Sequence, residues 1–283
     1  MPIEQNQTVL ARWSESAPYW EKHRDTIREM FAPVTQALIE DAEIAERCTV
    51  LDVATGPGEP ALTIAGVVGP DGNVVGTDPV AGMVEAARRE AQRRGLHNAS
   101  FELAFAESLP FPDGSFDVVA CRFGAMFFPS PVEAIQEWLR VLKPGGKIAL
   151  AVWHFADRNP FHYVLSRIVE RHAGASPAAP DSADAFRFAE PGKLKAVLSE
   201  AGAAAPSERL LRFPIQARVS PEDFWALRRE MSETLRSKLA VLSKQQMSAL
   251  TAEVIEALTA YAREDGIDFS GEVLIVTAGK AAA

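Results

Sequence analysis

The chain has 283 residues, with 29 Lys and Arg against 38 Asp and Glu, so its formal net charge is −9. Hydrophobic residues make up 47% and charged residues 24%, which is typical of a folded protein of one or two domains and excludes a largely disordered chain. The acidic balance disfavours nucleic acid as a partner, because phosphate binding needs clustered Lys and Arg.

The cysteine count and the N-terminal sequence exclude further classes of protein. Cys48 and Cys121 are too few and too far apart for a thiolate zinc site or a disulfide framework, so we expect no metal. The first ten residues lack the basic start and apolar run of a secretory signal. No apolar run approaches the roughly 20 residues of a membrane span. These features predict a cytoplasmic protein without a membrane span.

The first half of the chain alternates helical and strand-like segments. Residues 1–47 are predicted to form a helical cap, because apolar residues recur at three- and four-residue steps, with a break at Pro33. Residues 48–153 are predicted to form a cofactor-binding core. The expected strands are 49–54, 73–78, 100–103, 116–121 and 147–153, and the expected helices are 61–68, 81–94 and 131–142. This rhythm is typical of a doubly wound parallel sheet.

After residue 153 the rhythm changes. Residues 154–283 are expected to complete the sheet with strands at 208–217 and 272–278. A helical insert at about 214–265 is predicted to form a lid, together with residues 154–190 and the N-terminal cap. A basic run in this insert is interleaved with acids and predicts a solvated face; it comprises Arg228, Arg229, Arg236 and Lys238. The predicted fold is α/β, with a doubly wound, seven-stranded, mostly parallel sheet and a helical lid.

One turn between strand and helix carries most of the chemical information. Gly56, Gly58 and Ala61 fit the G-x-G-x-x-G/A turn that brings a backbone close to a nucleotide. An NAD-dependent oxidoreductase is one interpretation. However, Asp52 would repel a pyrophosphate and suits an ammonium group instead. Asp78 ends the second strand, where it can accept hydrogen bonds from ribose hydroxyls. A ribose and a cation without a pyrophosphate describe S-adenosylmethionine.

Four stretches between about Val50 and Trp153 make a family resemblance specific: VLDVATGPGEPAL, VVGTDPVAGMVEAAR, AESLPFPDGSFDVVACRFGAMFF and VLKPGGKIALAVW. They resemble the class I S-adenosylmethionine-dependent methyltransferases, close to the ubiquinone and menaquinone C-methyltransferases. The resemblance implies a Rossmann-like methyltransferase fold and methyl transfer to a small acceptor, with S-adenosylhomocysteine as product. An RNA methyltransferase is the alternative, disfavoured by the charge of −9. A homodimer is the assembly considered.

The resemblance also implies roles for individual residues. Those expected around the methionine moiety are Asp52, Ala54, Thr55, Gly56 and Gly58. Those expected at the ribose, the adenine and the sulfonium are Asp78, Pro79, Met83, Ala106 and Arg122. Relatives often carry an acid where this chain has Phe105, so packing or Glu107 is expected to hold the adenine.

The acceptor site is expected to be hydrophobic or aromatic. Its predicted lining consists of Trp20, Phe123, Met126, Phe127 and Trp153. Trp20 stands where relatives usually carry Tyr. If the acceptor needs a general base, the candidates are His154 first and His23 second, because both fall in lid segments near strand ends. An ordinary hydrogen-bonded histidine is the alternative for each.

Overall fold

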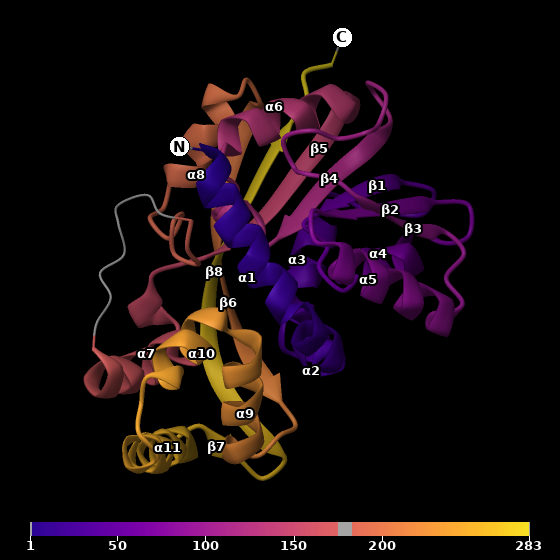
Figure 1. Cartoon of the computed structure of the whole chain (residues 1–283). Coiled ribbons are helices and arrows are strands. Elements are labelled where there is room, and N and C mark those ends of the chain that lie inside the picture. Colours follow the sequence, from indigo (N-terminus) through magenta and orange to yellow (C-terminus); the bar gives the residue numbers. More distant parts are fainter. Residues whose placement is uncertain (1, 175–182, 283) are drawn as a thin grey trace.

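The computed structural model describes residues 2–174 and 183–282. Its sheet has the order β3-β2-β1-β4-β5-β8-β6, and a short β7 pairs with β8 (Figure 1). The strands are β1 (Thr49–Val53), β2 (Asn73–Asp78), β3 (Ala99–Leu103), β4 (Phe116–Arg122), β5 (Leu142–Trp153), β6 (Ala204–Ala217), β7 (Ala262–Arg263) and β8 (Gly266–Gly279). The pairs from β3 to β5 are parallel, and β8 is antiparallel to β5 and β6. The predicted fold class is confirmed, with β7 as an addition.

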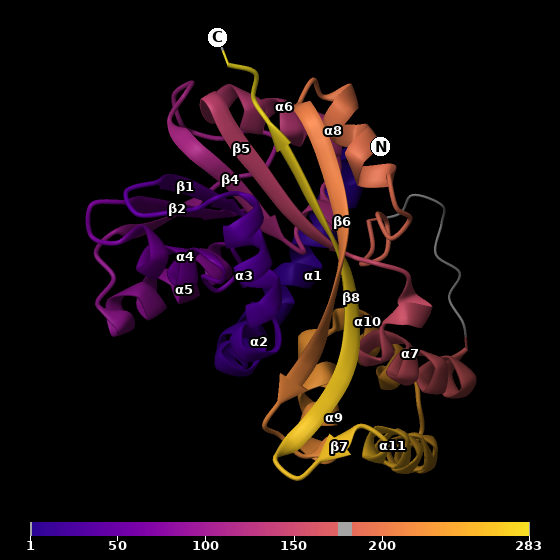
Figure 2. The ribbon, with the colours of Figure 1, turned by 180° about the vertical axis from the view of Figure 1, so that it is seen from behind.

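Helices cover both faces of the parallel strands, which explains why β1, β2 and β4 are buried along most of their length, whereas the edge strand β3 is mostly exposed. In β1, Val50 and Leu51 are both fully buried although they point to opposite faces. One side carries α3 (Ala32–Asp41), α4 (Ala61–Val68) and α5 (Ala81–Arg94), and the other carries α6 (Pro131–Val141) and α8 (Lys193–Glu200) (Figures 1 and 2).

The N-terminal segment is helical as expected, but its breaks differ from the prediction. The helices are α1 (Pro2–Lys22), α2 (Arg24–Met30) and α3, interrupted at His23 and Phe31. Pro33 lies in the first turn of α3, where a missing N–H costs nothing, so it starts a helix rather than ending one. Helix α1 packs against α5 on one side and against α9 (Pro221–Met231) and α10 (Glu233–Ala240) on the other.

The C-terminal half is built on two long strands. β6 and β8 have 14 residues each and run together well beyond the parallel strands (Figure 2). Between them the chain forms α9, α10 and α11 (Lys244–Thr259), beside α7 (Pro160–Ala173). Short 3-10 turns, η1 (Ala125–Phe127) and η2 (Ala156–Arg158), follow β4 and β5. Residues 175–182 of the predicted lid lie outside the described residues.

Serine side chains define where the helices of the insert begin. Ser220, Ser232 and Ser243 each accept a hydrogen bond from the backbone N–H three residues later. Such caps satisfy N–H groups that the helix itself leaves unpaired. Within the described residues, no helix combines the length and the apolar character needed to cross a membrane.

Candidate active site

A cavity lies at the carboxyl ends of β1, β2 and β4, where a doubly wound sheet typically binds ligands. We call it the strand-end cavity. It encloses about 1210 Å³, open solvent included. Its walls come from residues 53–57, 78–80, 104–107 and 122–124, and from the α1 side chains Leu10, Trp13 and Trp20.

Unusual backbone conformations shape this cavity. Ala54 and Phe123 have φ angles of 58° and 64°, and Gly56 has 57°. The left-handed region is unfavourable for alanine and phenylalanine, so neighbouring structure must hold the ends of β1 and β4 in place. The two ends also approach closely, since a Cβ added to Gly124 would lie 2.5 Å from the Cβ of Ala54. Strained residues concentrate at functional sites.

Asp78 links two walls of the strand-end cavity. Its Oδ2 accepts a hydrogen bond from the Gly56 N–H at 3.0 Å, and its Oδ1 accepts one from the Val80 N–H at 3.0 Å. Burial raises the pKa of this carboxyl to about 6, although the two hydrogen bonds act in the opposite direction. Asp78 is therefore fixed in position before any ligand arrives.

Two residues of the predicted cofactor set do not line the cavity. Asp52 is fully buried, and its Oδ2 accepts from the N–H of Ala61 at 3.1 Å, at the start of α4. Burial raises the pKa of Asp52 to about 7, while the Thr55 hydroxyl and the Ala61 N–H act in the opposite direction. Gly58 packs on Leu62 instead, whose Cδ1 would lie 2.6 Å from an added Cβ. Direct contact of either residue with the methionine moiety was expected, and the structure places both outside the cavity wall.

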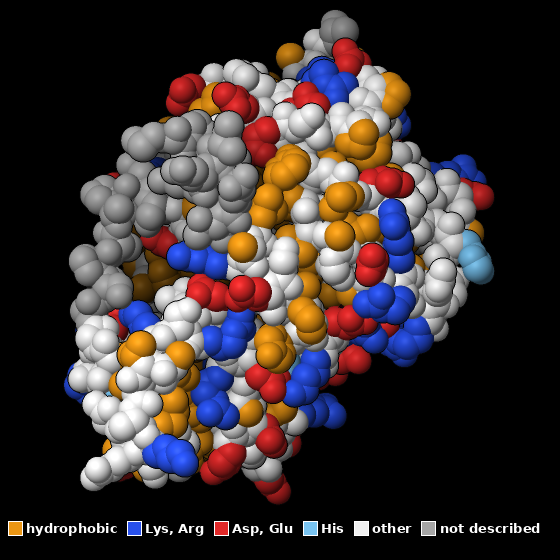
Figure 3. Space-filling view, viewed as in Figure 1, with side chains coloured by type: hydrophobic (Ala, Val, Ile, Leu, Met, Phe, Trp, Pro, Cys, Tyr) orange, Lys and Arg blue, Asp and Glu red, His pale blue; other side chains and the backbone are white. Residues whose placement is uncertain are grey.

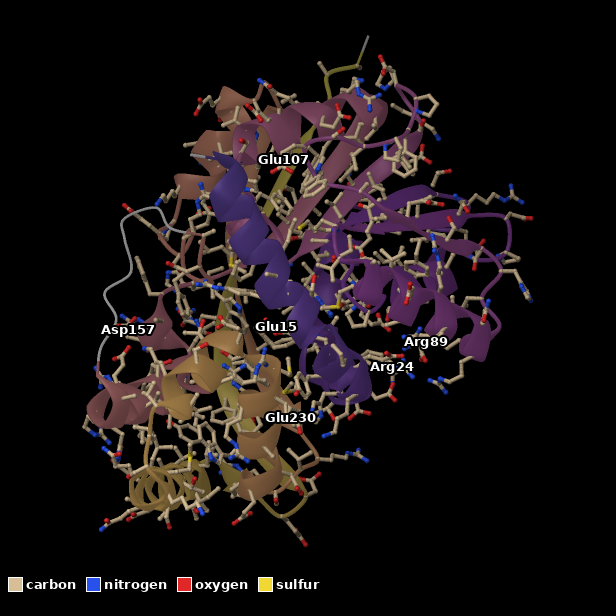
Figure 4. All side chains as sticks on the ribbon, viewed as in Figure 1. Glu15, Arg24, Arg89, Glu107, Asp157 and Glu230 are labelled. Atoms are coloured by element: carbon tan, nitrogen blue, oxygen red, sulfur yellow. The ribbon has the colours of Figure 1, made fainter. Side chains whose placement is uncertain are left out.

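The rest of the predicted cofactor set does line the strand-end cavity: Ala54, Thr55, Gly56, Asp78, Pro79, Met83, Ala106, Glu107 and Arg122. The buried Thr55 hydroxyl lies beside the Asp52 carboxyl and acts to lower the pKa of that acid. Glu107 faces the cavity near α1 (Figure 4), and burial raises its pKa. Phe105 also lines the cavity and is 45% exposed, so its ring is accessible for packing against a ligand. Their individual roles stay predictions.

Arg122 is positioned by the protein itself. Its Nη1 donates to the Thr35 hydroxyl at 2.7 Å, and its Nη2 donates to the carbonyl of Glu59 at 3.2 Å. The guanidinium carbon lies 6.0 Å from the centre of the Phe31 ring. Burial lowers the pKa of Arg122, while Glu59 and Asp52 oppose that shift. Arg122 thus ties the end of β4 to α3 beside the expected sulfonium position.

A second cavity adjoins the first and extends under the insert. This lid cavity encloses about 1230 Å³, open solvent included, and shares Trp13, Trp20, Phe31, Phe123 and Phe127 with the strand-end cavity. Figure 3 shows a hollow with a hydrophobic floor and charged side chains at its rim on the face that carries α1. Every predicted acceptor-site residue lines the lid cavity: Trp20, Phe123, Met126, Phe127 and Trp153.

Aromatic stacking makes the wall between the cavities rigid. The rings of Phe123 and Trp153 stack at 4.7 Å with an angle of 4° between their planes. Phe31 meets both rings edge-on, at 5.2 and 5.7 Å. Trp13 meets Phe127 edge-on at 5.2 Å. These geometries are the favourable ones for aromatic pairs.

Neither proposed catalytic histidine lines either cavity. The Nε2 of His23 lies 2.5 Å from the carboxylate of Glu230, which Figure 4 labels. The Nδ1 of His154 lies 2.8 Å from the carboxylate of Glu272 on β8. Each imidazole contacts a carboxylate from a different helix or strand, which is typical of a histidine with a structural role. The general-base roles of His154 and His23 stay predictions.

Sequence reasoning missed two polar residues of the lid cavity, His162 on α7 and Arg228 on α9. Arg228 was assigned to a solvated face, but burial lowers its pKa to about 10. Burial also lowers the pKa of His162 well below its usual range. The available signal was the helical spacing from Phe224 to Arg228, which puts Arg228 on the buried face.

An ion-pair cluster braces the other side of the strand-end cavity. Glu90 of α5 is inaccessible to solvent and lies 2.9 Å from Arg24 and 2.6 Å from Arg94. Arg94 also reaches Glu59 at 2.8 Å. Arg24 and Glu59 themselves line the cavity. In Figure 4, Arg24 and Arg89 lie at the junction of α2 and α5.

Among the described residues, no group of three or more His, Cys, Asp or Glu side chains is placed to hold a metal ion.

Comparisons with known proteins agree with this geometry. Residues 50–146 match the family model of a methyltransferase domain. The uncharacterized methyltransferase YcgJ of Bacillus subtilis is 40% identical over 44% of this chain and 47% of its own length. Its crystal structure matches with a TM-score of 0.57 and 25% identity, covering 88% of this chain and 98% of that one.

Two further relatives are similar over more of their length. Demethylmenaquinone methyltransferase of Thermus thermophilus is 36% identical over 59% of this chain and 79% of its own. Nocamycin O-methyltransferase of Saccharothrix syringae is 30% identical over 88% of this chain and 91% of its own. Of the two cofactors considered above, NAD and S-adenosylmethionine, membership of this family implies S-adenosylmethionine. The chain belongs to the class I S-adenosylmethionine-dependent methyltransferases.

Proposed function

We propose that the chain transfers a methyl group from S-adenosylmethionine in the strand-end cavity to a small aromatic acceptor in the lid cavity. The observation that carries this proposal is the aromatic wall that the two cavities share. A donor in one cavity and an acceptor in the other would meet where the two cavities join, beside Phe123 and Phe127. The names of relatives that act on demethylmenaquinone and nocamycin support a small molecule as acceptor.

S-adenosylmethionine supplies an activated methyl group, so the protein must mainly align the acceptor and exclude water. Asp78 would accept hydrogen bonds from the ribose hydroxyls, since its carboxylate is already oriented by Gly56 and Val80. Met83, on α5, would pack against the adenine. Thr55 lines the same cavity and would lie near the methionine moiety.

The lid side would control the approach of the acceptor. Trp13 and Trp20 project from α1 into both cavities and would exclude water from the reacting atoms. The stacked Phe123 and Trp153 rings line the lid cavity and would favour an aromatic acceptor there. An RNA acceptor fits this aromatic interior and the net charge of −9 less well.

Calorimetry with S-adenosylhomocysteine tests the cofactor half of the proposal. We expect binding to the unmodified chain and a roughly tenfold or greater loss in Asp78→Ala, because several hydrogen bonds to a charged group are removed. Asp71→Ala is the matched control, since the Asp71 side chain is 74% exposed beside Arg47. The absence of binding to the unmodified chain, or equal binding by Asp78→Ala, would contradict the proposal.

A further inference from the structure

Arg228 is a cationic side chain that lines the lid cavity. Arg228 projects from α9, and no carboxylate pairs with it in the described part of the chain. Its guanidinium carbon lies 4.2 Å from the centre of the Phe161 ring, and its Nε has no hydrogen-bond partner there. By contrast, Arg236 of the same insert donates to Ser16 and to the carbonyl of Glu230.

The other charged side chains that line this cavity in the described part of the chain are Arg12, Asp184 and Glu233. Arg12 and Glu233 form their own ion pair at 3.3 Å. Asp184 also lines the cavity and has interactions of its own. Burial of an unpaired cation is costly, and an aromatic face offsets only part of that cost. With a pKa of about 10, Arg228 nevertheless stays charged at neutral pH. An anionic ligand group would complete the site.

His162 supplies a neutral polar atom in the same cavity. Its Nε2 is shielded from solvent and has no partner among the described residues. The ring is held edge-on by Trp153 at 4.5 Å and by Phe161 at 4.9 Å. Burial and the nearby Arg228 charge lower the pKa of His162, so the imidazole is neutral. A neutral imidazole can exchange one hydrogen bond with a hydroxyl group.

We infer that Arg228 and His162 select the acceptor: a flat aromatic compound whose anionic oxygen group pairs with Arg228 and whose hydroxyl group meets His162. This inference rests on the proposed function and specifies its substrate class. The aromatic rings of Trp153 and Phe161 enclose the same space, so the ring system and the charge are recognised together. An acidic aromatic acceptor would bind there, and its neutral analogue would leave the guanidinium unpaired.

Titration of 2-naphthoate and of its uncharged analogue 2-naphthamide tests the role of Arg228. Both are titrated into the full chain with and without S-adenosylhomocysteine. The matched control is Arg229→Gln, because Arg229 is the next residue of α9, also has an unpartnered Nε, and does not line the lid cavity. We expect the unmodified chain and Arg229→Gln to prefer naphthoate by roughly tenfold or more, and Arg228→Gln to lose that preference.

The outcomes separate this inference from the proposed function. Absence of S-adenosylhomocysteine binding refutes the cofactor half, whatever the naphthyl probes do. If S-adenosylhomocysteine binds but naphthoate shows no preference, does not bind, or keeps its preference in Arg228→Gln, the inference on Arg228 is overturned. A melting temperature of Arg228→Gln at or above that of the unmodified chain shows that folding is not the cause, since an unpaired buried charge has been removed.

A third probe, 3-hydroxy-2-naphthoate, tests His162. The hydroxyl group should strengthen binding to the unmodified chain, and His162→Phe should abolish that gain while leaving 2-naphthoate affinity within about threefold. An equal loss for both probes would assign His162 a purely steric role and remove it from the inference.

Discussion

The carboxylate of Asp78 accepts the backbone N–H of Gly56, so the end of β2 is bonded to the glycine turn that follows β1. A second bond from Val80 fixes the other oxygen. The carboxylate therefore needs no rearrangement to receive a ribose, which lowers the entropic cost of binding.

This arrangement predicts a pH-dependent affinity for S-adenosylhomocysteine. The pKa of Asp78 is about 6 in the free protein. Hydroxyl donors favour its ionised form, so affinity should fall as pH decreases through 6, by up to about tenfold per pH unit. Calorimetry between pH 8 and pH 5 measures this fall. Asp78→Asn should bind weakly with a flatter profile, and an equally steep profile in that variant would assign the effect to another group.

Asp52 predicts a pH dependence of stability. Its pKa is raised to about 7, so its contribution to the free energy of unfolding is present at low pH and lost as pH rises through 7. The loss should reach up to about 1.4 kcal/mol per pH unit between pH 5 and pH 7. Urea unfolding of the ligand-free chain checks this. Asp52→Asn should lose less stability over that range, and Asp71→Asn, an exposed control, should match the unmodified chain.

Glu90 predicts the opposite pH dependence of stability, because its contribution is lost as pH falls. Its pKa is lowered to about 2, first by the hydrogen bond from Arg93. Glu90→Gln should lower the free energy of unfolding by about 3 kcal/mol at pH 7, because Arg24 and Arg94 lose their buried partner. This difference should shrink as pH falls from about 5 to 2. The exposed Glu85→Gln, on the same helix, serves as the control. Equal stability of the two variants would contradict the prediction.

Gly124 predicts a steric effect on the cavity wall. An added Cβ would lie 2.5 Å from the Ala54 Cβ and 2.8 Å from the Cys121 sulfur. Gly124→Ala should therefore destabilise the chain by about 1–3 kcal/mol and weaken S-adenosylhomocysteine binding. Gly66→Ala, in α4, meets nothing within 4 Å and should be neutral or stabilising. Unchanged binding by Gly124→Ala would show that the cavity wall can adjust.

The sheet could be predicted from the sequence because local patterns encode it. The run from Thr49 to Val53 is apolar and β-branched, and the glycine turn follows directly. Asp78 and Phe123 line one cavity because parallel strands bring their carboxyl ends to one edge, and their roles stay predictions.

Long-range packing explains what the sequence did not reveal. The predicted final strand began at residue 272, whereas β8 begins at Gly266, because its first half is stabilised by pairing with β6, which is distant in sequence, and with the short β7. His162 and Arg228 are 66 positions apart and meet only when α7 and α9 fold against each other. His23 and His154 looked available because their partners, Glu230 and Glu272, are distant in sequence.

The length of β6 and β8 separates the residues of the two proposed binding sites. The glycine turn and Asp78 belong to the parallel strands, whereas Arg228 belongs to helices carried on the far extension of these two strands (Figure 2). The proposed donor site and the proposed acceptor-selecting residue are therefore carried by different parts of the sheet, and helix α1, which contacts the insert and lines both cavities, connects them.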